Sequence, residues 1–294
     1  MGDKSKIEWT DASWNPIRGC SLVSAGCTNC YAMRVAHRLK SYRGLTRMTE
    51  HGPVWTGQVR LVPELLDQPL RWKRPRRIFV NSMSDLFHES VPDDFVFKVF
   101  ETMISERRHT FQILTKRPER MKKFLFLRDW SEDHAKLAPH ICLGVSCEDQ
   151  KTADDRIPLL LQTPAAVRWI SAEPLLGAMD LRSYLPWPQV PQGNQNFLNW
   201  VVVGGESGPH ARPMHPDWAR KVRDDCVNAG VPFFFKQWGE WVSIEDSGEE
   251  YWEICKNPAR VHSWPDGPCS YRVGKKAAGR LLDGREWNEY PEVK

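Results

Sequence analysis

Short runs rich in β-branched and aromatic residues recur along the chain, and most are followed by a segment long enough for a helix. There are eight such runs, at residues 14–19, 59–62, 78–83, 110–115, 141–146, 167–172, 199–204 and 231–235. Apolar residues at helical spacing predict helices over 31–42, 63–72, 92–107, 118–128, 152–162 and 215–229. Strands that alternate with helices favour parallel βα units, and eight units predict an α/β fold of the TIM type, a closed (β/α)8 parallel barrel.

The pattern changes after residue 238. Residues 1–238 contain all eight runs, so we expect them to form the barrel. Residues 239–294 are rich in Trp and show no clean period, which predicts an irregular C-terminal extension packed on the barrel. The Pro/Gln/Asn-rich stretch 186–196 predicts a surface loop.

No stretch of the sequence approaches eighteen consecutive apolar residues, and the first residues lack the basic and then apolar pattern of a signal peptide. We therefore expect a cytoplasmic protein without a membrane partner. Disulfides are rare in that compartment, so the eight cysteines are not expected to form a disulfide framework. A tight cluster of thiols there indicates metal binding or catalysis.

Three cysteines lie within eleven positions in "GCSLVSAGCTNCYA" (19–32): Cys20, Cys27 and Cys30. They follow the first predicted strand, at the end where a parallel barrel carries its active site. Three thiolates can bind three irons of a four-iron, four-sulfur (4Fe–4S) cluster and leave the fourth iron open for an exchangeable ligand. An alternative is a structural zinc site completed by His37, seven positions after Cys30.

These residues resemble the radical S-adenosylmethionine (SAM) enzymes, whose barrels carry three cluster cysteines after the first strand. "CTNCYA" (27–32) and "FQILTKRPERM" (111–121) are similar to the spore photoproduct lyase-like branch, although the first gap between cysteines is six residues here instead of three. The resemblance implies SAM as a cofactor and an electron donor protein as a partner.

A second resemblance covers nearly the whole predicted barrel. "WTDASWNPIRGCSLVSAGCTNCYA" (9–32), "GGESGPHARPM" (204–214) and "FFFKQWG" (233–239) resemble a phage-associated three-cysteine family of unknown function, the domain of unknown function 5131. This resemblance implies a phage setting, with a phage-encoded protein as a further partner. It implies no established reaction.

Polar residues follow nearly every predicted strand, which favours a site at that edge. If SAM binds, Lys116 or Arg117 suits its carboxylate by charge-assisted hydrogen bonding. The expected cofactor-binding residues are Asn81, Thr115, Lys116, Arg117, Ser146, Glu173, Gly204 and Gly205, and the candidate catalytic residues are Lys116, Glu173 and Glu206. A different interpretation is a barrel hydrolase that uses paired carboxylates from Glu148, Glu173 and Glu206.

The charge of the chain is unevenly distributed. Residues 1–128 contain 23 Lys and Arg against 13 Asp and Glu, whereas residues 129–294 contain 18 against 24. Basic stretches at 71–77 and 116–123 indicate either a solvated surface or a face that binds phosphates. The leading hypothesis is a radical SAM-like iron–sulfur enzyme, a lyase or transferase that repairs or modifies a nucleic-acid base or nucleotide. The alternative without catalysis is a zinc-stabilised nucleic-acid-binding protein.

Overall fold

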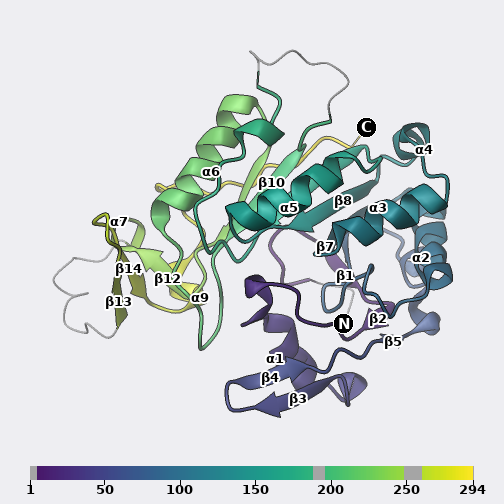
Figure 1. Cartoon of the computed structure of the whole chain (residues 1–294), viewed down its shortest axis with the longest axis horizontal. Helices are drawn as coiled ribbons and strands as arrows, with labels where there is room; N and C mark the ends of the chain where they lie inside the picture. Colours follow the sequence, from purple (N-terminus) through teal and green to yellow (C-terminus); the bar gives the residue numbers. More distant parts are fainter. Residues whose placement is uncertain (1–4, 188–195, 248–259, 294) are drawn as a thin grey trace. The chain divides into compact units, whose positions relative to one another are not determined.

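The structure is a computed structural model that describes residues 5–187, 196–247 and 260–293 (Figure 1). Most of the predicted loop 186–196 and Cys255 lie outside these residues. The chain divides into two compact units. Unit 1 contains residues 1–145, 158–169 and 292–294, and unit 2 contains residues 146–157 and 170–291. The two units are described separately.

The fold is mixed α/β, and its main sheet has seven strands in the order β1-β6-β7-β8-β9-β10-β11. These strands are β1 (Ala12–Trp14), β6 (Arg77–Val80), β7 (Thr110–Thr115), β8 (Ile141–Ser146), β9 (Val167–Ala172), β10 (Trp200–Gly204) and β11 (Phe233–Gln237). The pairs β1–β6, β6–β7, β7–β8 and β10–β11 are parallel. The sheet order is open, with β1 and β11 at its ends, so the closed eight-stranded barrel that we predicted is not found.

The missing strand is the run at 59–62. It forms the two-residue strand β5 (Arg60–Leu61), which pairs antiparallel with β2 (Ile17–Arg18) outside the main sheet. The helix predicted at 63–72 is replaced by two short 3-10 helices, η3 (Pro63–Leu65) and η4 (Pro69–Arg71). Pro63 suits a first helical position, but Pro69 lies inside the predicted helix, where its ring blocks the preceding turn and removes a backbone donor, so a continuous α-helix does not form.

In unit 1, strands β6 to β8 are covered by helices α2 (Asp93–Ser105) and α3 (Pro118–Leu127), followed by α4 (Glu132–Leu137) (Figure 1). Helix α3 begins with Pro118, whose fixed φ suits a first helical position. The rings of Phe100 and Phe124 lie 5.7 Å apart, so the buried faces of α2 and α3 meet. Strand β8 is buried at every position, as expected for a strand inside a parallel sheet.

A smaller substructure of unit 1 follows the cysteines. It consists of η1 (Ala25–Cys27), α1 (Tyr31–Arg38), η2 (Lys40–Tyr42) and the antiparallel hairpin β3 (Thr46–Thr49) and β4 (Gly52–Trp55). Figure 1 shows α1 beside the hairpin. They share a core of buried residues, Ala32, Met33, Ala36, Tyr42, Leu45, Trp55 and Met83. The sequence analysis predicted the helix but not the hairpin.

In unit 2, α6 (Pro216–Ala229) lies between β10 and β11 in the chain and ends at Gly230 with φ of 68°. Helix α5 (Gln150–Leu161) begins in this unit, and η5 (Arg182–Tyr184) lies within it. The chain after residue 239 is more regular than predicted: it forms β12 (Trp241–Ser243), α7 (Ile244–Ser247), β13 (Val261–Ser263), β14 (Cys269–Arg272) and α9 (Lys275–Ala278). The three strands form an antiparallel sheet in the order β12-β14-β13. The division into a barrel over residues 1–238 and an extension packed on it over residues 239–294 stays a prediction.

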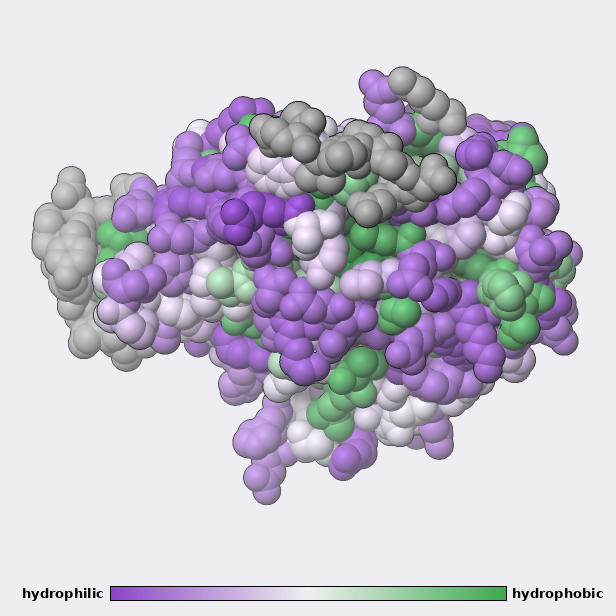
Figure 2. All heavy atoms as spheres, turned by 45° about the horizontal axis from the view of Figure 1, so that its top comes forward, coloured by the Kyte–Doolittle hydropathy of each residue, from purple (hydrophilic) through white to green (hydrophobic). Residues whose placement is uncertain are grey.

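The surface is mostly polar on the face that Figure 2 shows, where hydrophobic residues form separate smaller areas. Within the described ranges, no helix has the length and apolar character needed to cross a bilayer.

Candidate functional site

The loop with the three cysteines begins at a fixed point at the carboxyl ends of β1 and β6. Gly19 forms a parallel bridge with Ser84, and the Ser84 hydroxyl donates to the Ile17 carbonyl at 2.8 Å. Gly19 has φ of 91°, and a Cβ there would lie 2.2 Å from the Gln58 carbonyl oxygen. Only glycine combines this conformation with so close an approach of two backbones. The thiol loop, residues 19–30, is therefore anchored to the sheet edge.

The three thiols are free and half-buried. The Cys27 amide donates to the Ser24 carbonyl at 2.9 Å and the Cys30 amide to the Cys27 carbonyl at 3.2 Å, so short turns lead directly into α1. Burial raises the pKa of the Cys20 thiol to about 12, and the Cys30 and Cys27 sulfurs add to this rise. Burial also raises the pKa of Cys30, with a further contribution from Cys27. Burial therefore disfavours the thiolate forms of Cys20 and Cys30.

A buried arginine ties the thiol loop to the end of β7. The Arg117 guanidinium donates to the Asp85 carboxylate at 2.9 Å, to the Glu89 carboxylate at 2.7 Å and to the Ser21 hydroxyl at 2.7 Å. Burial by itself lowers the pKa of Arg117, but Asp85 and Glu89 outweigh it and hold that pKa above its usual value. The Asp85 carboxylate also accepts from the Thr115 hydroxyl at 2.7 Å. Arg117 and Thr115 are therefore occupied by protein groups.

Ser21 is held from a second side by His88, which is 2% exposed. The Ser90 amide donates to His88 Nδ1 at 3.1 Å, so the proton of the neutral ring is assigned to Nε2. Nε2 lies 3.0 Å from the Ser21 hydroxyl oxygen and donates to it. Burial, followed by the charge of Arg117, lowers the pKa of His88 and keeps the ring neutral. Two donors thus fix the residue that follows Cys20.

Two polar groups at the same edge of unit 1 can still bind a ligand. Asn81 is 2% exposed and has φ of 61°, and its Nδ2 has no hydrogen-bond partner in the described structure. An unpaired buried amide is costly, so Asn81 is a donor poised for an acceptor atom. Lys116 is half-buried, and its charge acts to lower the pKa of Cys30 against the effect of burial. An ammonium group therefore lies near the thiols.

In unit 2, the predicted site residues form ion pairs. The Lys236 ammonium of β11 contacts the Glu173 carboxylate at 2.5 Å, and both side chains are largely buried. A Cβ on Gly204 would lie 3.4 Å from the Glu173 side chain, whereas a Cβ on Gly205 would lie 1.9 Å from the Trp238 carbonyl oxygen. At Gly205 the absence of a side chain thus makes room for the protein's own backbone.

The other two carboxylates of the hydrolase interpretation, those of Glu148 and Glu206, are paired with arginine. The Glu206 carboxylate accepts from Arg212 Nη2 at 2.5 Å and from Nε at 2.9 Å. Glu148 is fully buried and contacts Arg156 at 3.0 Å, and the same guanidinium donates to the Ser146 carbonyl at 2.7 Å. Glycoside hydrolysis needs a carboxyl group free to carry a proton. Because each of Glu148, Glu173 and Glu206 contacts a cation, the arrangement does not favour the hydrolase interpretation.

Comparison with known proteins identifies the family. A family model described as a protein of unknown function, DUF5131, matches residues 4–291. The chain belongs to this family. No curated protein matches it. Among solved structures, spore photoproduct lyase complexed with dinucleoside spore photoproduct is 10% identical, with a TM-score of 0.42 over 94% of this chain and 72% of that chain. A mutant of that lyase with bound AdoMet and dinucleoside spore photoproduct is 10% identical, with a TM-score of 0.41 over 93% and 71%.

The possible metal ligands of this DUF5131 chain are Cys20, Cys27, Cys30 and His37, and the two metal centres predicted for them are a 4Fe–4S cluster and a zinc site. Among the described residues, no three or more His, Cys, Asp or Glu side chains surround a point where one metal ion could bind. A zinc site needs four ligands around one ion, and the His37 ring instead lies 3.1 Å from the Thr46 hydroxyl. A 4Fe–4S cluster takes one thiolate per iron, so its thiolates do not converge on one ion. Cys20, Cys27 and Cys30 supply one thiolate for each of three irons, so their chemistry suits such a cluster, and its presence stays a prediction.

The two basic stretches have different surroundings in the DUF5131 chain. Residues 71–77 precede β6, at the opposite end of that strand from the thiol loop. In the stretch 116–123, Arg117 is buried, and Arg120 donates to Asp93 and to backbone carbonyls of His88 and Val91. Phosphate binding by either stretch stays a prediction. The clamp formed by Ser21, Asp85, His88 and Arg117 was not predicted, since its members are far apart in the sequence.

Proposed function

We propose that this DUF5131 protein is a radical SAM-like iron–sulfur enzyme that acts on a nucleic-acid base or nucleotide. The observation that carries the proposal is the gathering of Cys20, Cys27 and Cys30 on one anchored loop at the carboxyl edge of a parallel sheet. Ligand sites in parallel α/β sheets lie at this edge. The thiols would hold a 4Fe–4S cluster, which together with SAM supplies one-electron chemistry for removing a hydrogen atom from a substrate.

The residues of unit 1 have separate roles in this proposal. Arg117 and His88 position the thiol loop through Ser21, because both donate to the same hydroxyl oxygen. Lys116 is the cation for the SAM carboxylate, and Asn81 Nδ2 is the donor for an acceptor atom of the cofactor. Arg117, named for the carboxylate in the sequence analysis, has a positioning role instead. Functional roles for the unit 2 residues Ser146, Glu173, Gly204, Gly205 and Glu206 stay predictions.

Two features support a substrate that approaches the thiol loop from solvent. Leu22 and Val23 lie in the loop and are 53% and 43% exposed, although apolar side chains are usually buried. The first 128 residues, which lie in unit 1, carry a clear excess of positive charge. An exposed apolar loop suits the face of a base, and positive charge suits its phosphates.

The test is anaerobic purification followed by metal and sulfide analysis. We expect about four iron and four sulfide per chain, with broad visible absorption. Cys27→Ser should lose the iron, whereas Cys269→Ser, which removes a half-buried thiol of unit 2 outside the loop, should retain it. Addition of SAM to the reduced protein should change the electron paramagnetic resonance spectrum of the cluster. One zinc per chain without sulfide would overturn the proposal.

A further inference from the structure

Residues 31–60 of unit 1, here called the basic lobe, carry an unusual charge. They contain six Lys and Arg and one acidic residue, Glu50. The net charge of the whole chain is only +4, because the other residues are nearly balanced or acidic. The lobe consists of α1, η2 and the β3–β4 hairpin, and ends with Arg60 of β5. This segment was not among the basic stretches that the sequence analysis selected.

One cation of the basic lobe, Arg60, has a structural role. Arg60 donates to the carbonyl oxygens of Ser41 and Arg43, at 3.0 Å each, and so fixes the turn after α1. Four other cations, Arg38, Lys40, Arg43 and Arg47, are exposed. In the described structure no ion pair joins any of these four to a carboxylate, and Glu50 is the only acidic residue of the lobe. Their side chains are thus available to an external anion.

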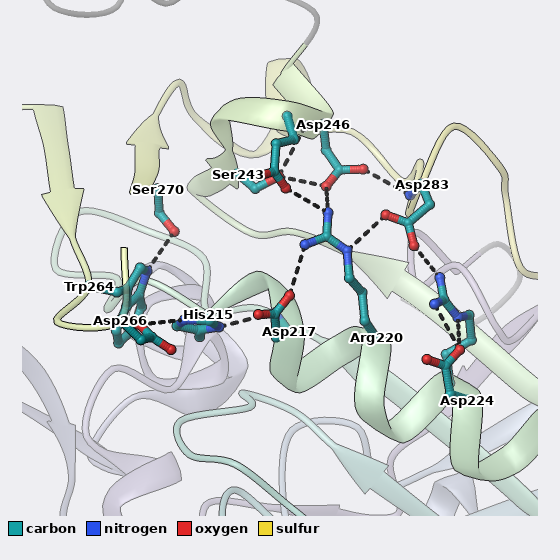
Figure 3. A network of polar contacts seen from close by, with 12 residues as sticks. His215, Asp217, Arg220, Asp224, Ser243, Asp246, Trp264, Asp266, Ser270 and Asp283 are labelled. Carbon is teal, nitrogen blue, oxygen red and sulfur yellow. Dashed lines mark hydrogen bonds and ion pairs between the residues drawn. The ribbon is translucent and has the colours of Figure 1, made fainter. Parts of the chain in front are cut away.

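Two arginines of α6 in unit 2 are instead neutralised by carboxylates. Arg220 contacts the carboxylates of Asp217, Asp246 and Asp283 within 3.0 Å (Figure 3). It also contacts the Glu245 carboxylate at 3.1 Å. Arg223 on the same helix pairs with Asp224 and Asp283. Uncompensated like charges, such as those of the lobe, repel one another and destabilise a compact state. A lobe that keeps four unneutralised cations is better explained by an anionic partner than by stability.

The lobe adjoins the thiol loop. Cys20 and Cys30 pack against the buried residues shared by α1 and the hairpin, including Met33 and Trp55. Helix α1 begins directly after Cys30, and its first residue, Tyr31, is 44% exposed. An anion held on the outer face of the lobe would therefore lie on the same small substructure as the thiols.

We infer that the basic lobe binds the phosphate backbone of a nucleic acid and delivers the strand to the thiol loop. Three of its four available cations are arginines, whose planar guanidinium matches the phosphate group. A membrane surface is a poorer match, because membrane-surface helices carry a long apolar face and α1 has eight residues. The delivery to the thiols rests on the proposed function, whereas the binding itself requires neither cluster nor cofactor.

The test is fluorescence anisotropy with labelled twenty-nucleotide single-stranded DNA, duplex DNA and RNA, titrated at several salt concentrations. The variant R38Q/K40Q/R43Q/R47Q removes the four available cations. Each phosphate contact contributes about 0.7 to 0.9 to the slope of log affinity against log salt, so loss of all four should lower that slope by roughly 3. Between 50 and 200 mM salt, wild-type affinity should fall about 50- to 150-fold more than that of the variant.

The matched control is K6Q/K98Q/R107Q/K136Q, which removes four exposed cations of unit 1 outside the lobe and outside the two basic stretches. It should retain the wild-type affinity and salt slope for whichever nucleic acid binds. The inference is overturned if wild type binds none of the three probes, or if the lobe variant keeps the wild-type slope. Both variants should keep their iron content. Wild type that contains iron but binds no probe would overturn this inference and leave the proposed function standing, whereas wild type that binds a probe but contains no iron would do the reverse.

Discussion

Replacing Arg117 with Gln should destabilise unit 1 strongly. The side chains of Arg117 and Asp85 are only 6% and 7% exposed, so water neither screens the pair nor replaces the missing guanidinium. Removing one partner of a buried ion pair typically costs about 3–5 kcal/mol. Asp85 keeps donors from the Thr115 hydroxyl and the Phe87 and Lys116 amides, so we expect the lower end, about 3 kcal/mol. Glu89 is 67% exposed, so loss of its ion pair with Arg117 adds less than about 1 kcal/mol to this destabilisation.

The assay is urea denaturation followed by tryptophan fluorescence, for which the chain has fourteen tryptophans. Arg71→Gln is the control, since its ion pair with Asp67 is exposed on both sides and should contribute less than about 1 kcal/mol. The double variant R117Q/D85N should recover part of the loss, because it removes the unpaired charge. If R117Q unfolds within about 1 kcal/mol of wild type, or if D85N gives no recovery, the buried pair does not hold this edge of the unit.

Gly205→Ala should lower the free energy of unfolding by about 2 kcal/mol or more, because the new Cβ would lie 1.9 Å from a backbone oxygen. Gly204→Ala should lower it less, since its Cβ would lie 3.4 Å from a side chain. Equal melting temperatures of the two variants would contradict this. Burial lowers the pKa of His140 below 6.5, so the unfolded state binds a proton first and stability falls as pH drops below 6.5. His140→Asn should reduce that fall between about pH 7.5 and 5.5 in urea denaturation, and an unchanged pH dependence would exclude this histidine as a cause. Lys236→Met should cost about 2–3 kcal/mol in the same assay by leaving Glu173 unpaired, and a smaller loss for Glu173→Gln is expected.

Local sequence patterns predicted the main sheet well. The runs at 110–115, 141–146 and 167–172 match β7, β8 and β9 residue for residue. β8 and β9 are buried at every position and β7 at four of its six, so a largely apolar run with charged or Gly-rich ends defines each of them. The same reasoning failed at 59–62, where a short run pairs with β2 instead. It also misplaced the first strand, predicted at 14–19, because β1 ends at Trp14 and Ile17–Arg18 form β2 outside the main sheet. The run itself does not specify a partner strand, because pairing depends on the geometry of the segments around it.

Part of the candidate site could likewise be predicted from the sequence, and part could not. The spacing of Cys20, Cys27 and Cys30 indicated a metal-binding loop from sequence alone, because local spacing limits which thiols can bind one centre. Only the tertiary structure places Arg117 against Ser21, at a sequence separation of 96, and only there do Glu173 and Lys236 become a pair. A hydrogen bond or ion pair depends on the distance and direction between two side chains. Those quantities are set by how the strands and helices pack, and residue order does not contain them.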